Sequence, residues 1–481
     1  MSETNNSSRA GRLGAPGVVF IVVAAAAPLS IMAGTAPFAL SIGGLAAPAA
    51  YLVAGAVLTL FAVGFTRMTR VVHGGGAFYS YVTLGLGRRA GAATGVLALI
   101  SYNAIQFGSY GLLGMQFEAA VARFTGLDLP WWVWSLLAVA AIWALGRRGA
   151  EVSACLLGVL LVVESLLLAA LVVAVVAQGG HSGLSLAGLT PQAWGHPGIL
   201  AALGIAFVCF MGFESTAIYR TEARHGDRTI TRATYAAVAF LAVFYALVLW
   251  ALVQAIGDAD AVAVAGADPT AVLMTVIEDY LGAAAGTITY IFLVTSIFAS
   301  QVAFHNAINR YARALAEDGL LPAGLQRVHP RFGSPTRAGA VQSIAAATVI
   351  VAAAILGADP FLQMTIWVST PGTIGVLAMQ CLASAAVAAF FLRRTAGRAT
   401  AVIAAVSTVA LVVLLALVIV NIDLITGAGA VTNNVLLTVP AVAFVTGLVA
   451  AGLLRHRRPA IYARIGGEDA QRVLAENPQG S

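Results

Sequence analysis

Twelve apolar runs follow one another along the chain, separated by short polar segments. Hydrophobic residues make up 60% of the sequence and charged residues 10%, which leaves too little polar surface for a water-soluble fold of this size. Apolar runs of about 20 residues are typical of helices that cross a lipid bilayer. The sequence therefore predicts an all-α polytopic membrane protein. Its runs are Gly17–Leu40, Ala47–Phe65, Gly91–Val121, Trp131–Leu145, Val152–Val176, Ile199–Tyr219, Ala233–Ile256, Ala284–Ile308, Ala338–Leu356, Phe361–Leu392, Ala401–Ile422 and Val431–Leu454.

The positions of the arginines predict the orientation of these helices. The chain has no lysine, and with the N-terminus inside the cell every arginine except Arg123 falls in an inner loop or tail. Positive residues concentrate on the cytoplasmic side of membrane proteins, so the net charge of +6 reflects topology and gives no support to nucleic-acid binding. We expect cytoplasmic tails at 1–16 and 455–481 around one transmembrane domain, 17–454, in the plasma (inner) membrane.

Two of the runs carry residues that interrupt a helix. The first contains Pro28, Gly34 and Pro37, and a proline inside a helix removes a backbone hydrogen bond. The sixth contains Gly212 and then Glu214, although an ionisable side chain at bilayer depth costs about 2.5–3.5 kcal/mol on insertion scales. The first and sixth runs occupy equivalent places in two successive sets of five. This pairing predicts a transporter built from inverted repeats, with its site between the two breaks.

Three stretches together resemble the amino acid-polyamine-organocation permeases. FMGFESTAIYRTEARHGDRTITRAT resembles the sixth-helix signature of that superfamily, with Thr231 in place of the usual proline. Residues 298–322 resemble its eighth helix and following loop, and residues 73–95 its loop between helices two and three. The resemblance implies the five-plus-five inverted-repeat fold with broken helices 1 and 6. The repeats would cover about 17–176 and 197–392, with helices 11 and 12 at about 401–454 outside them.

The same resemblance implies a substrate site at the two breaks. In this superfamily backbone amides of the broken first helix receive a substrate carboxylate, and carbonyls of the broken sixth helix receive its amino group, as helix-end dipoles favour. The family's glycine break aligns with residues 32–34, with residues 30 and 31 as an alternative register. Pro28 and Glu214 are expected to be structural residues at the breaks, and the phenylalanines are either substrate lids or core residues. The candidate binding residues are Ser30, Ile31, Met32, Ala33, Gly34, Phe207, Val208, Phe210, Met211 and Gly212.

Glu164 is the candidate coupling residue. It is the only charged residue within the fifth apolar run, and the resemblance places it where some permeases carry a lysine in the position of a sodium ion. Burial disfavours the charged form of a carboxylate, so we expect Glu164 to carry a proton. The alternative is a neutral acid that hydrogen-bonds the backbone of the first helix. Thr295 and Ser296 match hydroxyls that bind sodium in related folds, which makes sodium coupling a further, weaker alternative.

The resemblance implies uptake of a small amino acid by alternating access. A neutral, zwitterionic substrate is favoured because residues 30–34 and 207–212 contain no carboxylate for a second ammonium group. The alternatives are a polyamine or alkanolamine permease in which Glu214 turns into the pocket, an amino acid exchanger, and a membrane sensor or scaffold that does not transport. His73 beside three glycines resembles the inner gate, but we expect a solvated loop residue there. The sequence has no metal-ligand spacing, nucleotide loop or nucleophile-base pair, so we expect neither an enzyme nor a cofactor or metal.

Overall fold

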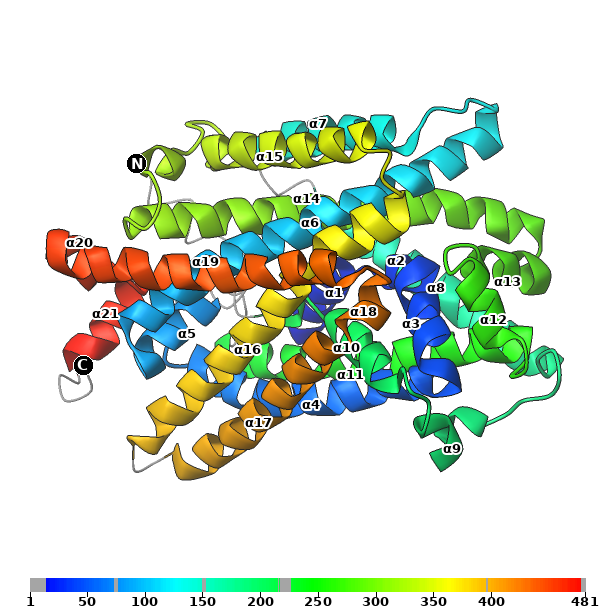
Figure 1. The fold of residues 1–481 in the computed structure, drawn as a ribbon, viewed down its shortest axis with the longest axis horizontal. Helices are drawn as coiled ribbons and strands as arrows, with labels where there is room; N and C mark the ends of the chain where they lie inside the picture. Colours follow the sequence, from blue (N-terminus) through cyan, green and yellow to red (C-terminus); the bar gives the residue numbers. More distant parts are fainter. Residues whose placement is uncertain are drawn as a thin grey trace.

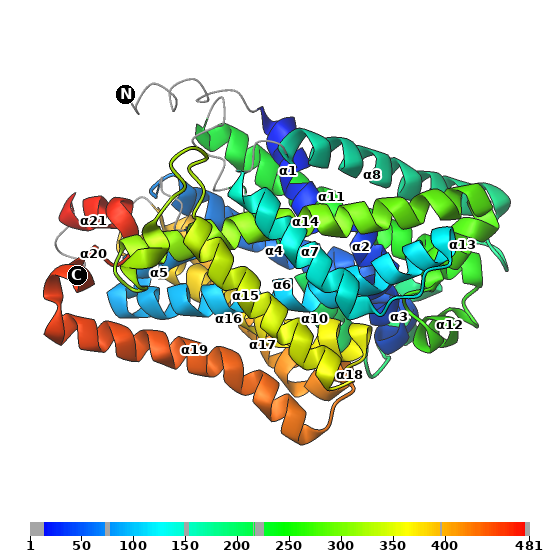
Figure 2. The ribbon, with the colours of Figure 1, turned by 90° about the horizontal axis from the view of Figure 1, so that it is seen from above.

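The computed structural model describes residues 14–72, 77–148, 153–214, 216, 226–394 and 397–476, and every regular element within them is a helix. Figures 1 and 2 show an elongated bundle in which most of the long helices run along the longest axis. These long helices are α4 (Ala47–Thr69), α6 (Arg88–Thr125), α7 (Trp131–Arg147), α8 (Ser153–Gln178), α11 (Gly226–Ile256), α14 (Ala283–Glu317), α15 (Thr336–Ile355), α16 (Val368–Leu392), α17 (Arg398–Val420) and α19 (Ala430–Arg457).

Short helices occupy the breaks, the turns and the ends of the bundle. Those near the first break are α1 (Ala15–Ala26), α2 (Pro28–Ser30), the π-helix η1 (Ile31–Thr35), α3 (Ala36–Gly43) and η2 (Gly44–Ala46). The others are α5 (Ala77–Leu86), η4 (Ala187–Leu189), α9 (Pro191–Trp194), α10 (Ile199–Val208), α12 (Ala261–Ala267), α13 (Val272–Leu281), η6 (Ala323–Gln326), η7 (Pro360–Trp367), α18 (Ile422–Thr426), α20 (Pro459–Arg464) and α21 (Gly467–Glu476).

Nine helical segments within the described residues are long and apolar enough to cross a membrane, which makes the chain an integral, multi-pass membrane protein. One of them, Pro28–Thr69, joins the second half of the first predicted run to the second run and bends at Gly44, where φ is 66°. Helices α7 and α10 are apolar but shorter. Part of the sixth predicted run, Ser215 and 217–219, lies outside the described residues, as does the loop at 220–225. The twelve spans and their inverted repeat therefore stay a prediction.

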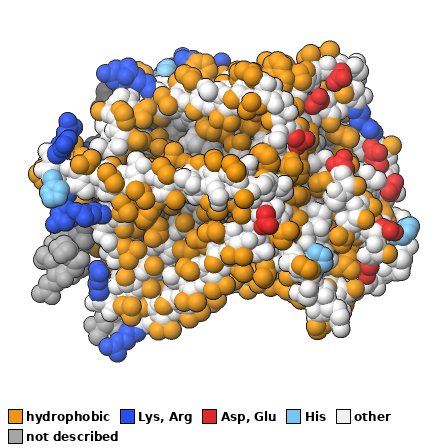
Figure 3. Space-filling model, viewed as in Figure 1, with side chains coloured by type: hydrophobic (Ala, Val, Ile, Leu, Met, Phe, Trp, Pro, Cys, Tyr) orange, Lys and Arg blue, Asp and Glu red, His pale blue; other side chains and the backbone are white. Residues whose placement is uncertain are grey.

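The two ends of the bundle differ in charge. Arginines gather at one end, where α4, α7 and α19 finish and α6 begins, and acidic residues gather at the opposite end, as Figure 3 shows on the face that it presents. We call these the arginine-rich end and the acidic end. Arg123, the arginine that breaks the sequence pattern, lies at the acidic end, where its guanidinium is 2.8 Å from the Glu278 carboxylate.

The centre of the bundle is packed by helices from both halves of the chain. Helix α6 lies against α16, α19 and α14, while α4 lies against α11 and α17. Small residues permit the closest approaches, as is common between membrane helices. A β carbon added at Gly111 of α6 would lie 2.4 Å from the Pro360 carbonyl oxygen, which fixes how near η7 comes. Valines such as Val402, Val409 and Val445 are more than half exposed along α17 and α19, as expected of surfaces that face lipid.

Candidate functional site

The first helix is interrupted at Ala27, between α1 and α2. Ala27 is the only non-glycine residue with positive φ among the described residues, with φ 45° and ψ 69°. The interruption occurs there because Pro28 begins a new helix and supplies no N–H for the preceding one. The Ser30 hydroxyl donates to the Ala27 carbonyl at 2.8 Å, and the Tyr245 hydroxyl donates to the Ala26 carbonyl at 3.4 Å. The break frees the Ala26 carbonyl, which Tyr245 satisfies, whereas the Ala27 carbonyl also accepts the backbone N–H groups of Ser30 and Ile31.

The stretch matched to the family's glycine break remains helical. Residues 31–35 form the π-helix η1, in which Met32 and Ala33 are fully buried. Gly34 permits close packing here, since a β carbon added to it would lie 3.1 Å from the Phe361 ring. The break therefore lies upstream of the register that the sequence suggested, and Ser30 is the candidate binding residue nearest to it. A π-turn is itself common at functional sites of helices.

The second break follows α10. Residues 209–213 form successive tight turns in place of a helix, and Gly212 has φ 112°. The Glu214 side chain folds back on this turn, because its Oε2 accepts a hydrogen bond from the Gly212 amide at 3.0 Å. Its Oε1 accepts one from the Tyr102 hydroxyl of α6 at 3.3 Å. Both oxygens of this buried carboxyl group therefore have partners within the protein.

An aromatic cluster lies between the two breaks. Phe210 is fully buried against Tyr51 of α4 and Tyr245 of α11, with ring centroids 6.5 and 6.0 Å apart. The Tyr51 hydroxyl lies 3.6 Å from the sulfur of Cys209, and Tyr245 reaches the first break as described above. Phe207, also buried, belongs to the same core. Sequence reasoning missed the two tyrosines, because other hydroxyl residues such as Thr59 and Tyr235 share their apolar runs and the sequence does not separate them.

Glu164 and Ser296 come together beside the first break. The Ser296 hydroxyl of α14 donates to Glu164 Oε2 of α8 at 2.8 Å, and α2 packs against both helices. Glu164 is 2% exposed, and its Oε1 has no hydrogen-bond partner among the described residues. The Thr295 hydroxyl instead donates to carbonyls of its own helix, at 2.9 Å from Ile291 and 3.0 Å from Phe292.

The unpartnered oxygen determines what this pair can do chemically. A buried acceptor without a donor costs free energy, so the site favours protonation of this oxygen or binding of a hydrogen-bond donor to it. A proton on the carboxyl group, a water molecule or a substrate ammonium group would each do so. Within the described residues no group of three or more His, Cys, Asp or Glu side chains could hold a metal ion.

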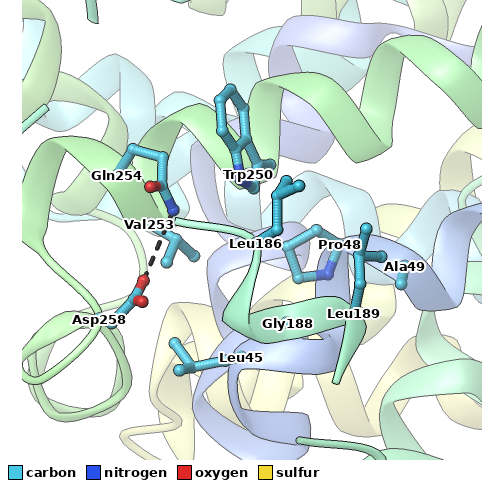
Figure 4. A pocket seen from close by; sticks show the side chains of 10 residues that line it. All are labelled: Leu45, Pro48, Ala49, Leu186, Gly188, Leu189, Trp250, Val253, Gln254 and Asp258. Atoms are coloured by element: carbon cyan, nitrogen blue, oxygen red, sulfur yellow. Dashed lines mark hydrogen bonds between the residues drawn. The ribbon is translucent and has the colours of Figure 1, made fainter. Parts of the chain in front are cut away.

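The acidic end covers the first break. Helix α12 packs against α3, and α13 packs against η1. Beside them a hollow of about 500 Å³ is open at the surface, with His196 and Asp258 in its wall. Figure 4 shows the narrower recess that adjoins it, where the Gln254 amide donates to Asp258 at 3.5 Å. Trp250 and Gln254 also fix the loop above, since both bond the backbone of Ser185.

Comparison with known proteins gives matches along most of the chain. The sequence model of the amino acid permease family matches residues 13–454. An uncharacterized transporter of Mycobacterium tuberculosis is 29% identical over 262 residues, which cover 51% of this chain and 56% of that protein, and a Mycobacterium bovis transporter gives the same values. Another M. tuberculosis transporter is 27% identical over 315 residues, 60% of this chain and 63% of that protein. The matched part thus spans little more than half the length of these curated relatives.

Proposed function

The chain belongs to the amino acid permease family, and from this premise we propose that it imports a small, neutral amino acid across the plasma (inner) membrane by alternating access. The proposed architecture has twelve spans, five-plus-five inverted repeats, two extra helices and both termini in the cytoplasm. Two interrupted helices with an aromatic cluster between them support it, because such breaks supply free backbone groups for a polar substrate.

The neutral substrate is supported by the surroundings of Glu214. Its two oxygens bond Gly212 and Tyr102, so the carboxyl group closest to the sixth-helix break is occupied by the protein itself. A polyamine or alkanolamine permease would require that carboxyl group to turn toward an amine. The proposed ligands are the backbone groups of residues 30–34 and 207–212 and the Ala26 carbonyl. Those of the first helix would become available to a substrate when η1 unwinds or Tyr245 gives up its bond to Ala26.

The pairing of Glu164 with Ser296 carries the proposal of proton coupling. In this mechanism Glu164 holds a proton while the site is loaded and releases it when the site faces the cytoplasm. Its free oxygen, its burial and its place beside the first break favour this role over a purely structural one. Ser296 donates to the ionised form and therefore stabilises the carboxylate after proton release.

Uptake into proteoliposomes tests the coupling. With an acidic exterior, the parent protein is expected to accumulate labelled amino acid above equilibrium, and a protonophore should abolish that excess. Glu164→Gln keeps the size of the side chain but cannot titrate, so accumulation should be lost while exchange of labelled for unlabelled substrate persists. Accumulation by Glu164→Gln equal to that of the parent, at equal incorporation, would show that the carboxyl group is structural.

Two neighbouring hydroxyls provide a matched control. Ser296→Ala removes the hydrogen bond to Glu164 and should reduce accumulation, whereas Thr295→Val removes a hydroxyl that bonds only its own helix and should not. If accumulation in the parent requires sodium and ignores the protonophore, sodium coupling replaces the proton mechanism.

A ligand panel tests the substrate class. Compounds that bind the folded protein raise its melting temperature, so neutral amino acids are expected to stabilise it. Stabilisation by putrescine or ethanolamine, without any by amino acids, would favour the amine permease. Ligand binding without flux in proteoliposomes would favour a sensor, and flux seen only as exchange would favour an exchanger.

A further inference from the structure

The C-terminal segment folds back onto the arginine-rich end. After α19, the short helix α20 leads to α21, which lies beside α5, as Figures 1 and 2 both show. Ile465, between α20 and α21, is fully buried, and so is Ala470 of α21. The turn requires glycine at Gly466, where φ is 106° and an added β carbon would lie 2.5 Å from the Thr83 methyl group. The segment is therefore fitted closely to α5.

One tyrosine hydroxyl joins this segment to two helices. Tyr79 of α5 is 1% exposed, and its hydroxyl donates to Asp318 Oδ2 at 2.8 Å, directly after α14. The same hydroxyl accepts a hydrogen bond from the Gly466 amide at 2.7 Å. Arg464 adds a second link, because its guanidinium donates to the Glu317 carbonyl. The C-terminal segment thus bridges α5, from the first half of the chain, and the end of α14, from the second.

The Tyr79 hydroxyl is one of the donors that stabilise the buried Asp318 carboxyl group. Burial raises the pKa of the Asp318 carboxyl, while the hydrogen bond from Tyr79 and the charge of Arg464 oppose that rise. The negative charge of Glu317, like burial, raises the pKa of Asp318. The Gly467 amide also donates to Asp318, so loss of the Tyr79 hydroxyl would leave Asp318 with one donor fewer and the Gly466 amide without its partner.

Helix α5 occupies the connection between α4 and α6, and it packs against α6 and α16. In the proposed alternating access, opening of the arginine-rich end would move this connection relative to α14. The bridge made by the C-terminal segment opposes such a movement, since its contacts exist only while α5 and the end of α14 stay together. A contact present in one state biases the population toward that state.

We propose that residues 459–476 form a clasp that holds α5 against the end of α14 and releases when the arginine-rich end opens. The clasp rests on the proposed transport function for its role in opening. Its first tests, however, need neither substrate nor flux. Their failure would concern the clasp alone, whereas absence of flux with every amino acid would concern the proposed function.

Thiol labelling of Ser80→Cys tests the clasp. Ser80 of α5 is 3% exposed beneath the segment, near Gly467, so a cysteine there should react only when the segment lifts. We expect Tyr79→Phe to accelerate labelling of this site about tenfold, a factor equivalent to about 1.4 kcal/mol. A chain that ends at Arg458 should be labelled fastest. Mass spectrometry of the labelled peptide distinguishes this site from the native cysteines.

Tyr81→Phe is the matched control. Tyr81 lies two residues further along α5 and is 2% exposed. Its replacement by phenylalanine also removes a hydrogen bond, but the partner is the Thr69 hydroxyl of α4 and not the C-terminal segment. It should leave the labelling rate of Ser80→Cys unchanged. Equal rates for the two tyrosine variants, or slow labelling of the shortened chain, would overturn the clasp.

Hydrogen exchange and flux test whether the clasp restrains opening. Amides of residues 77–86 should exchange faster in Tyr79→Phe than in Tyr81→Phe, and exchange of labelled substrate in proteoliposomes should be faster as well. Faster labelling with unchanged amide exchange and unchanged flux would show that the segment is only a cover, and the proposal would be wrong.

Discussion

Two buried carboxyl groups, those of Glu214 and Glu164, differ in their hydrogen-bond partners, and this difference predicts different roles. Glu214 and Glu164 are 6% and 2% exposed, and each lies near a helix break. Glu214 has a partner for each oxygen, including the amide of the turn that it stabilises. Within the part of the chain that the structure describes, Glu164 has one donor, Ser296, and one oxygen without any. We therefore expect the first group to be needed for folding and the second for coupling.

Replacement of Glu214 tests this division. Glu214→Ala removes the acceptor of the Gly212 amide and of Tyr102, so we expect about 1–3 kcal/mol of destabilisation, measured by thermal unfolding of the purified protein. Glu214→Gln retains one acceptor oxygen and should lose less. If Glu214→Gln unfolds like the parent but no longer binds substrate, Glu214 is a ligand and the amine permease is favoured.

Contacts between elements depend on where glycines lie in the helices. Gly111 of α6 has no space for a methyl group, since the Pro360 carbonyl oxygen and the Met364 side chain would lie 2.4 and 2.7 Å from it. Gly158 of α8 has nothing within 4 Å of the same position. A substitution at Gly111 therefore tests close helix packing, and one at Gly158 tests intrinsic helix propensity.

Alanine at these two positions should act in opposite directions. Gly111→Ala is expected to push η7 away from α6 and lower the melting temperature, because its new contacts include rigid backbone. Gly158→Ala should raise helix stability by about 0.5–1 kcal/mol, as alanine does in helix interiors. Equal melting temperatures for the two variants would contradict the close packing of α6 on η7.

The elements also show what a sequence can predict and where it fails. Pro28 and the Gly212–Glu214 pair are recognisable because proline, glycine and a carboxyl group are each unusual within a membrane helix. The bend at Ala27 is not, since alanine has no preference for left-handed backbone. Nor does the sequence separate Ser296 from Thr295, because adjacent residues differ only in the face of the helix that they occupy, and that depends on how α8 packs.

The unequal charge of the two ends is the feature of the whole molecule that predicts its orientation in the membrane. Arginine at the membrane surface favours the cytoplasm, so the proposed orientation places the acidic end outside. Arg123 is the one arginine that this orientation places outside, and there it forms an ion pair with Glu278. An ion pair satisfies that guanidinium without altering the balance of the remaining arginines.

Labelling of introduced cysteines in intact cells tests the orientation. Asp268→Cys, between α12 and α13, should react with a membrane-impermeant thiol reagent added from outside. Arg331→Cys, between α14 and α15 at the arginine-rich end, should react only after the membrane is opened. The reverse pattern would invert the topology, and reaction of both from one side would rule out the alternation of loops.

The left-handed backbone at Ala27 places steric strain in the first helix. A non-glycine residue in this region holds about 1–2 kcal/mol of steric strain, and the two hydroxyls that bond the neighbouring carbonyls keep it there. Any rearrangement that returns this backbone to negative φ recovers that energy. A change of conformation at Ala27 would therefore release energy, whereas at an ordinary helical residue it would cost energy.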